Sequence, residues 1–390
     1  MPGYELIGKE EQRAINNFFN DHIKKKSNLP LLKSSKYVEL FEKKFANFIG
    51  CKYAICVSSG TAAIKTALVA AGVKKNDEVI TQSFTYVAVL EAILAVGAKP
   101  VVTEIDSTYN MCPSDLKKKI TKKTKVIMPV HMLGVAADMD KINQIAKRKK
   151  IIVIDDNCEA LGARWGNNML GNQSDMCAWS FDNGKTITTG EGGMVTTNNL
   201  QYYKLCKEYM DHGHENNPKF PRGKDTHRIY GFNFRVSELV GVIGLIQLKK
   251  ITKIININRK YSNIYKKILK KFDFTNLRKI PKKNIPLNDC VIFDLPNKRI
   301  AKNFLKELNN NNLITKNVPD AIEWHFAKYW DHIFKEQGVT KRKLLKKFPK
   351  SSEILEKSIS LPIFVNEKIK FVYKKAFILE KILEKISKKI

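Results

Sequence analysis

The sequence predicts an α/β protein with a largely parallel sheet that helices cover on both faces. From about residue 50 to 200, short continuous apolar runs alternate with amphipathic, helix-like segments, which is the pattern of a parallel sheet buried on both sides. The helical periodicity of residues 235–270 predicts one long helix. Beyond about residue 255 the segments are shorter and mixed, which is typical of a small additional α/β domain.

The strands and helices follow each other in a regular order along the first half of the chain. Ligands of such sheets gather at the carboxyl ends of the strands, so the residues that follow each strand are the first candidates for a site. The predicted strands are 53–59, 77–83, 100–105, 125–132, 151–156, 176–181 and 192–198, and the predicted helices between them are 61–72, 86–97 and 138–150.

Length and composition are those of a globular protein with more than one core. The chain has 390 residues, of which 43% are hydrophobic and 27% are charged. This length fits two domains, or one large domain with a smaller appendage. We place a large domain with an N-terminal helical segment at residues 1–250 and a small C-terminal domain at residues 251–390.

The charge of the chain bears on whether it binds nucleic acid, and its cysteines bear on its cellular compartment. The net charge of +31 would suit a nucleic-acid partner, but the lysines are spread in short clusters over helix-like stretches. We therefore expect a solvated cationic surface and no nucleic-acid partner.

The N-terminus lacks a signal-peptide pattern, and the most apolar segment, 239–248, is shorter than the roughly 20 residues of a membrane span. Seven scattered cysteines without a CxxC pair indicate a reducing compartment, so we predict a cytoplasmic protein without a membrane span.

Two of the predicted strand ends carry groups suited to a ligand. The turn SSGTAAI (58–64) would present backbone N–H groups at a helix N-terminus, where an anion is favoured; alternatively, Ser59 and Thr61 only cap the helix. Asp155 and Asp156 end another strand, where a carboxylate could hold a metal, partner a protonated ring nitrogen or cap the next segment. No second acid or histidine cluster lies near them in the sequence, so we expect no metal site.

A lysine follows the next strand end. Lys185 lies within SFDNGKTITTGEGG (180–193), among glycines and hydroxyl residues. Partial burial lowers the pKa of a lysine, and its neutral amine then forms a Schiff base with an aldehyde. An anion site, a carboxylate and a reactive lysine at successive strand ends are together what pyridoxal 5′-phosphate requires. A Walker-type nucleotide site is excluded, because the sequence has no GxxxxGK[ST] motif.

Six motifs of the chain occur together in one known family: SSGTAAI, SFTYVAVLEAI, PVHMLG, IDDNCEALGA, WSFDNGKTITTGEGG and GFNFRVSELVGVIGLIQL. In order and spacing they resemble the sugar aminotransferases of the DegT/DnrJ/StrS type, which are fold-type I enzymes dependent on pyridoxal 5′-phosphate. The resemblance covers nearly the whole chain. It implies a mainly parallel, seven-stranded sheet in the large domain and an enzyme that moves an amino group, with L-glutamate as donor, to a sugar carbonyl.

The resemblance also implies roles by position. Lys185 would form the Schiff base with the cofactor and shuttle the proton of the 1,3-shift, Asp156 would pair with the pyridinium nitrogen, and Tyr86 would stack on the ring. Relatives that are dehydratases carry histidine at the position of Lys185, so the lysine favours transamination over a sugar dehydratase. The intact set of residues also argues against a regulatory protein of this fold that lacks activity.

The cofactor phosphate would be held by residues of two subunits. Gly60, Thr61 and Ser180 would contact it from one chain and Asn233 from the neighbour, which requires a homodimer with shared active sites. Glu159 departs from the pattern, because the family commonly has Gln or His near the phenolic oxygen of the cofactor. A carboxylate beside a phenolate is repulsive unless it is protonated or turned away.

Further stretches bear on the amino acceptor: MPGYELIG, SFDNGKTIT, MDHGHENN, PRGKD and WHFAKYWDHI. They resemble one branch of the family, the 8-amino-3,8-dideoxy-manno-octulosonate (8-amino-Kdo) transaminases of bacterial lipopolysaccharide synthesis. This implies a small sugar acid, 8-oxo-3-deoxy-manno-octulosonate, as acceptor; a nucleotide-linked 4-keto-6-deoxy sugar is the alternative. His325 and Trp324 would line the sugar pocket, although Trp324 could equally belong to the core. A cationic loop would bind the carboxylate unless it only packs on the partner subunit. The cations of this loop are His212, His214, Arg222, Lys224 and Arg228.

Overall fold

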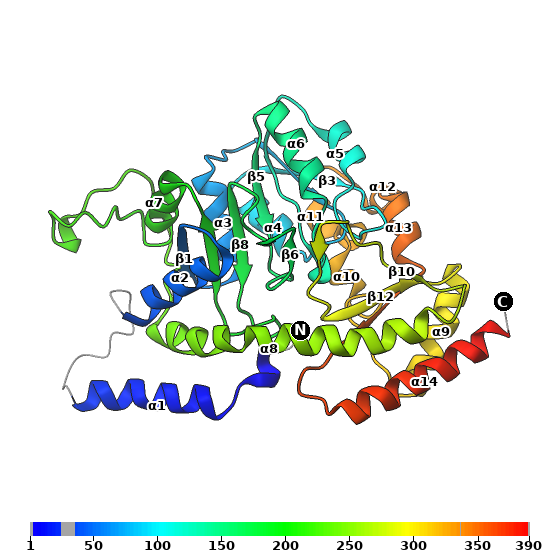
Figure 1. The fold of residues 1–390 in the computed structure, drawn as a ribbon. Helices are drawn as coiled ribbons and strands as arrows, with labels where there is room; N and C mark the ends of the chain where they lie inside the picture. Colours follow the sequence, from blue (N-terminus) through cyan, green and yellow to red (C-terminus); the bar gives the residue numbers. More distant parts are fainter. Residues whose placement is uncertain (1–2, 25–35, 336, 389–390) are drawn as a thin grey trace.

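The computed structural model describes residues 3–24, 36–335 and 337–388. Its centre is a seven-stranded sheet in the order β1-β9-β8-β5-β4-β2-β3 (Figure 1). Strand β9 runs antiparallel to its neighbours β1 and β8, and the other neighbouring pairs are parallel. The predicted mainly parallel, seven-stranded sheet is therefore confirmed. The strands are β1 (Tyr53–Val57), β2 (Glu78–Gln82), β3 (Lys99–Thr103), β4 (Thr124–Ile127), β5 (Ile152–Asp156), β8 (Met176–Ser180) and β9 (Gly193–Thr197).

The side chains of the large sheet enter hydrophobic cores on both faces. In β8, Met176 and Ala178 belong to the core formed with α3 (Gly60–Ala70) and α4 (Ala88–Ala95). Cys177 and Trp179 belong to the core formed with α2 (Lys36–Ile49) and α8 (Glu238–Leu269). Because both faces are buried, the strands read as continuous apolar runs rather than as an alternating pattern. The helices along this part of the chain are α2 (Lys36–Ile49), α3 (Gly60–Ala70), α4 (Ala88–Ala95), α5 (Pro113–Lys119), α6 (Met139–Lys149) and α7 (Leu200–Tyr209).

Polar side chains fix where several helices begin. The Ser59 side chain accepts the N–H of Ala62 at the start of α3, and the Asp138 side chain accepts the N–H of Lys141 at the start of α6. Such caps satisfy N–H groups that have no partner inside the helix. The start of α3 is therefore set by the sequence itself, directly after the carboxyl end of β1.

A 32-residue helix, α8 (Glu238–Leu269), joins the large sheet to the C-terminal part. Near its start, Gly244 lies against Phe41 of α2, and near its end Leu269 packs in a core that includes Leu379 of α14 (Ile369–Ser387). Figure 1 shows α1 (Lys9–Lys24) and α14 beside the two ends of α8. The long helix expected at 235–270 is confirmed. The domain boundary expected at residue 250 lies inside this continuous helix, and the division into two domains stays a prediction.

The C-terminal part has its own three-stranded antiparallel sheet, in the order β10-β12-β13, and its own hydrophobic core. A third small sheet, in the order β11-β6-β7, pairs a C-terminal strand with a hairpin that follows β5. The remaining strands are β6 (Arg164–Trp165), β7 (Asn168–Met169), β10 (Asn276–Leu277), β11 (Asn284–Ile285), β12 (Cys290–Asp294) and β13 (Ser358–Pro362). The remaining helices are α9 (Lys298–Asn310), α10 (Ile322–His325), α11 (Asp331–Lys335), α12 (Lys341–Leu345) and α13 (Pro349–Leu355), with 3₁₀ turns at Gly3–Leu6, Met132–Gly134, Arg222–Lys224 and Ala327–Tyr329.

Across the described ranges, no helix combines the length and the apolar character that crossing a bilayer requires. The seven cysteines are free thiols, and five of them are buried. The cytoplasmic location stays a prediction.

Candidate active site

A cavity of about 470 Å³ opens at the carboxyl ends of the strands of the large sheet. One wall consists of the residues that follow β1, β5 and β8, and another comes from residues 316–325 of the C-terminal part. A larger cavity, of about 620 Å³, lies between α1 and α8 and contains none of the predicted site residues. The predicted residues that line the strand-end cavity are Gly60, Thr61, Tyr86, Asp156, Glu159, Ser180, Lys185 and His325.

The N-terminus of α3 forms the anion-binding part of the cavity. Gly60 and Thr61 line the cavity, and the first N–H groups of a helix have no partner within it. A Cβ atom at Gly60 would lie only 2.8 Å from Cβ of Ser180 and 3.2 Å from Sγ of Cys158. Glycine at position 60 therefore allows the Ser180 hydroxyl to approach the helix N-terminus. N–H groups, a hydroxyl and a positive helix end suit a phosphate.

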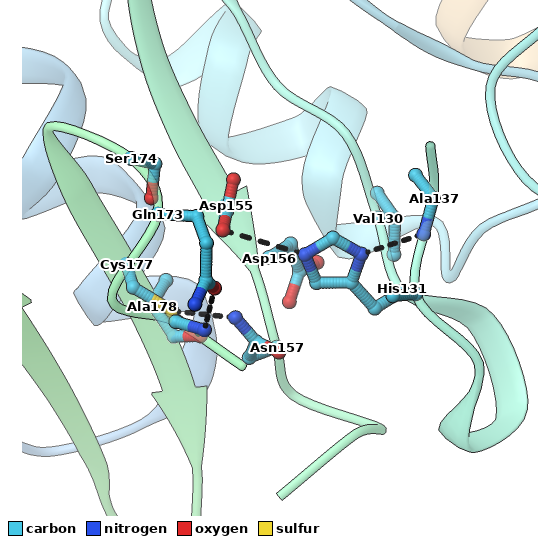
Figure 2. Close-up of polar contacts among 12 residues, drawn as sticks. Val130, His131, Ala137, Asp155, Asp156, Asn157, Gln173, Ser174, Cys177 and Ala178 are labelled. Atoms are coloured by element: carbon cyan, nitrogen blue, oxygen red, sulfur yellow. Dashed lines mark hydrogen bonds and ion pairs between the residues drawn. The ribbon is translucent and has the colours of Figure 1, made fainter. Parts of the chain in front are cut away.

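The adjacent acids Asp155 and Asp156 at the end of β5 lie in different environments (Figure 2). Asp156 lines the cavity, and its Oδ1 accepts the N–H of Cys158 at 2.9 Å. Asp155 is fully buried, with Oδ2 3.4 Å from Nε2 of His131, whose Nδ1 accepts the N–H of Ala137 at 3.0 Å. Successive residues of a strand face opposite sides of the sheet, so only one of the two acids can meet the cavity.

The environment of Asp156 suits a positively charged ring nitrogen. Burial raises the pKa of Asp156, and the hydrogen bonds with Cys158 only partly oppose this effect. A buried carboxylate whose charged form is disfavoured gains from a cationic partner. The residues at this place and at the α3 N-terminus therefore fit both ends of pyridoxal 5′-phosphate.

Lys185 stands on a loop whose backbone is held by small and hydroxyl residues. Oγ1 of Thr188 donates to the carbonyl of Phe181 at 3.0 Å and accepts the N–H of Gly190 at 2.9 Å. The carbonyl of Lys185 itself accepts the N–H of Gly3 at 2.7 Å. These contacts give a physical reason for the glycine- and threonine-rich sequence around the lysine, because they fix the backbone from which its side chain enters the cavity.

The charge on Lys185 is set mainly by its acidic neighbours. Its Nζ lies 3.8 Å from Oε1 of Glu159. Burial lowers the pKa of Lys185, but Glu159 and further acidic groups, including Asp156, outweigh burial, and the pKa of the amine is raised. The expectation of a lowered pKa was therefore wrong in direction, because burial alone was considered.

Glu159 is an ionised carboxylate in the wall of the cavity. Its Oε2 accepts the N–H of Leu133 at 3.2 Å. Burial raises the pKa of Glu159, but Lys185, other basic groups and the Leu133 N–H outweigh burial and leave the pKa below its usual value. The lowered pKa argues against the protonated form of Glu159. Whether the carboxylate turns away from the cofactor stays a prediction.

The C-terminal wall of the cavity is attached to the turn after β2. The N–H of Thr85 donates to the carbonyl of His325 at 2.9 Å, and the N–H of Val87 donates to that of Trp324 at 3.2 Å. The rings of His325 and Tyr86 lie 5.4 Å apart. Trp324 does not line this cavity and is 61% exposed, so the structure places it neither in the sugar pocket of its own chain nor in the core.

His325 presents a neutral imidazole. Burial lowers its pKa, although Glu159 opposes this effect. Its Nδ1 lies 2.7 Å from the carbonyl of Ala321, so this nitrogen donates and Nε2 remains as an acceptor. Such a group can accept a hydrogen bond from a substrate hydroxyl.

Lys316 and Asn317 also line the cavity, and sequence reasoning missed both. They lie in the stretch ITKNVPD, where a lysine is unremarkable in a chain with 69 lysine and arginine residues. Their sequence separation from β5 and β8 gives no indication that they approach the same site. The ITKN stretch lies shortly before WHFAKYWDHI, which contains His325. This proximity in the sequence was the one signal that could have placed Lys316 and Asn317 near the sugar pocket.

The cationic loop between α7 and α8 lies outside this cavity and extends away from the large sheet (Figure 1). Arg222 makes two hydrogen bonds to Asp211, at 2.7 and 2.8 Å, and His214 lies 3.4 Å from Asp225. Arg228 pairs with Glu208 and Glu215, and His212 is exposed. The structure therefore does not bring His212, His214 and Arg222 to the site of their own chain, and a role for them in substrate binding would require a second subunit.

Asn233 is exposed and also lies outside the cavity of its own chain. It pairs with Asp211 through a backbone bridge, next to Phe232, which is 42% exposed. This position is compatible with a contact to a neighbouring subunit. The shared active site stays a prediction.

Comparisons with known proteins show which sequences and folds this chain resembles. The model of the DegT/DnrJ/EryC1/StrS aminotransferase family matches residues 13–373. The GDP-perosamine synthase of Escherichia coli O157:H7 is 37% identical over 270 residues, which are 68% of this chain and 71% of that protein. The structure of Helicobacter pylori PseC, an aminotransferase involved in the biosynthesis of pseudoaminic acid, is 25% identical with a TM-score of 0.82 and covers 97% of both chains. The structure of an aminotransferase from Psychrobacter cryohalolentis, 23% identical, has the same fold with a TM-score of 0.86 over 98% of both chains.

Proposed function

Since this chain belongs to the DegT/DnrJ/EryC1/StrS aminotransferase family, we propose that it moves an amino group from L-glutamate to the 8-aldehyde of 8-oxo-3-deoxy-manno-octulosonate and so makes 8-amino-Kdo. The family match confirms the predictions of a sugar aminotransferase and of pyridoxal 5′-phosphate as its cofactor. The acceptor rests on the sequence resemblance to one branch of the family. The observation that supports it is a second buried lysine, Lys316, in the cavity wall, since a sugar acid requires a cation.

The cofactor supplies an electron sink for the transfer of the amino group in two half-reactions. We assign its phosphate to the N–H groups of Gly60 and Thr61 and to the Ser180 hydroxyl, which approach one another closely. We assign its ring nitrogen to Asp156, and we place Tyr86 against the ring. Each assignment follows from the donors or charges that these residues bring to the cavity.

Proton transfer falls to Lys185 in this proposal. Its Nζ would take the proton from the donor carbon that bears the amino group and would release it again at the far end of the 1,3-shift, so one group would act as base and then as acid. Glu159, 3.8 Å away, stabilises the protonated amine. The free Nε2 of His325 accepts a hydrogen bond from a hydroxyl of the sugar and orients its chain.

A nucleotide-linked 4-keto-6-deoxy sugar is the second candidate acceptor. The observation that favours it is the 37% identity with a GDP-perosamine synthase, whose product is by name a nucleotide-linked sugar. The two candidates differ in what the cavity must bind: a free carboxylate in one case, and a diphosphate with a nucleoside in the other.

A competition experiment tests the acceptor. The enzyme is first converted with L-glutamate, which should bleach the near-visible absorption of the bound cofactor. The free 8-oxo acid and a GDP-linked 4-keto-6-deoxy sugar are then offered together. We expect amination of the free acid and recovery of the nucleotide sugar unchanged. The opposite preference would contradict this acceptor and leave the aminotransferase assignment intact.

We also propose a homodimer in which Asn233 completes the site of the neighbour. Asn233 is exposed, and Tyr230 and Phe232 near it are 76% and 42% exposed, which suits an interface. Inactive Lys185→Ala and inactive Asn233→Ala proteins should regain activity when they are mixed, because hybrid dimers contain one intact site. An active monomer in sedimentation would argue against this arrangement.

A further inference from the structure

We propose that Lys316 and Asn317 form a carboxylate-binding subsite in the C-terminal wall of the cavity. The inference rests on the proposed function, because it identifies how the site holds an acidic substrate. Two substrates carry the required group: the amino-acid donor and the sugar-acid acceptor. The subsite is defined by the chemistry that they share, and the experiment below separates them.

Lys316 is a buried cation with donors to spare. Its side chain is 10% exposed and lines the cavity, and its Nζ lies 2.5 Å from Oδ2 of Asp289, which is fully buried. Burial lowers the pKa of Lys316, but Asp289 and other negative groups outweigh burial and raise the pKa, so the amine stays protonated. An ammonium group has three N–H donors, and within the described residues Asp289 is the only hydrogen-bond acceptor of Nζ. Two donors remain for a ligand.

Asn317 adds a second donor without a partner. Its side chain lines the same cavity, and its Nδ2 is buried and lacks a hydrogen bond within the described part of the chain. Buried donors are nearly always paired in folded proteins, so an unpaired one beside a cavity indicates a ligand atom. The backbone of Asn317 has a φ of +60°, a conformation that Asn tolerates better than most residues. An ammonium and an amide on adjacent residues match the two oxygens of a carboxylate.

The groups of the cavity that suit the cofactor are different ones. Lys185 lies beside Glu159, Asp156 suits the ring nitrogen, and the N-terminus of α3 suits the phosphate. Lys316 and Asn317 are therefore a cation and a donor that the cofactor does not need. Asp289 lies behind Lys316, holds it in place and keeps it charged over the working pH range.

Equilibrium binding to the enzyme loaded with its cofactor tests the subsite. The main variant is Lys316→Met combined with Asp289→Asn, so that no unpaired acid stays buried. A second variant, Asn317→Gly, removes one side chain and tolerates the positive φ. The control is Lys328→Met, since Lys328 is 15% exposed and pairs with Glu356 but does not line the cavity. Thermal melting verifies that each variant is folded.

Two pairs of non-reacting probes distinguish the substrates, and calorimetry gives Kd for each. Glutarate and its diamide represent the donor, and 3-deoxy-manno-octulosonate and its methyl ester represent the acceptor. The Lys316 variant should weaken binding of at least one acid roughly 10- to 100-fold, as expected for lost charge-assisted hydrogen bonds, and leave the matching neutral probe unchanged. Asn317→Gly should weaken the same acid by about threefold to tenfold.

The acid that is affected identifies the source of the carboxylate. If both acids bind the variants as tightly as they bind the wild-type enzyme and the Lys328 control, the subsite proposal is wrong. If the wild-type enzyme binds glutarate but not the octulosonate, the proposed acceptor fails, and the subsite is then judged on glutarate alone.

Discussion

The two walls of the cavity are built on different principles. Gly60, Asp156 and Lys185 stand at or just after the carboxyl ends of strands in one sheet, so the parallel arrangement brings them together. Lys316 and His325 come from a segment that follows α9, and hydrogen bonds to the turn after β2 place it over the site. We infer that the strand-end wall performs the cofactor chemistry and that the C-terminal wall selects the substrate. The predictions below test this division.

Replacing Lys185 should have the largest effect. Lys185→Ala should lower both half-reactions by at least about 10²- to 10⁴-fold, because the group that moves the proton is lost. The cofactor should still bind through its phosphate and ring nitrogen. Steady-state rates and the absorption of the bound cofactor measure the two effects. Borohydride reduction of the wild-type enzyme followed by peptide mapping supplies the control, and a label on another lysine would refute the assignment.

Replacing Asp156 should slow both half-reactions by about 10²- to 10³-fold, the usual range for a lost electrostatic contact at a reacting centre. The matched control is Asp155→Asn, which removes the adjacent acid on the other face of the sheet. It should destabilise the fold through His131 and leave the half-reaction rates much closer to those of the wild type. Equal losses in the two variants would show that the face of the sheet does not separate their roles.

The Asp156→Asn variant should also change how the stability of the protein depends on pH. Because burial raises the pKa of Asp156, the native state holds this proton more tightly than the unfolded state, and stability falls as pH rises from the usual carboxyl range through the raised pKa. Without cofactor, Asp156→Asn should therefore melt at a higher temperature than the wild type at pH 7, and the difference should shrink toward pH 3. Melting curves of both proteins between pH 3 and pH 7 test this prediction.

Replacing Gly60 should act on cofactor affinity. In Gly60→Ala the new methyl group would meet Ser180 at 2.8 Å, and such overpacking costs about 1–3 kcal/mol. Titration of the apoenzyme with pyridoxal 5′-phosphate should show this loss. Gly223→Ala is a suitable control, because no heavy atom lies within 4 Å of a Cβ at that position. An unchanged cofactor Kd would mean that the phosphate lies elsewhere.

Replacing His325 should have the smallest effect and the most selective one. His325→Ala should slow the acceptor half-reaction by about tenfold, because the lost free energy is that of roughly one hydrogen bond. The half-reaction with glutamate should keep its rate. Rapid-mixing measurements of each half-reaction separate the two. Equal losses in both would contradict the proposed division between the walls.

Asp155 and Asp156 at the end of β5 show what could not be predicted from the sequence. The run IIVIDD indicates a buried strand that ends in two carboxylates. Which of the two faces the cavity depends on how β5 is oriented between β4 and β8, and reasoning from residues alone left their role open. The family resemblance selected Asp156, and the structure places that residue in the cavity and Asp155 against His131.

The sequence by itself determined the α/β sheet, the long helix and the strand-end residues, because each depends on local periodicity and on the regular geometry of a parallel sheet. It determined neither the direction of the Lys185 pKa shift nor the approach of Lys316 and Asn317, and His325 was expected at the site only through the family resemblance. The charge on Lys185 depends on acids that only folding brings near. The C-terminal wall is held by contacts between residues more than 200 positions apart, such as Thr85 and His325. No periodicity encodes such a contact, so only the tertiary structure decided it.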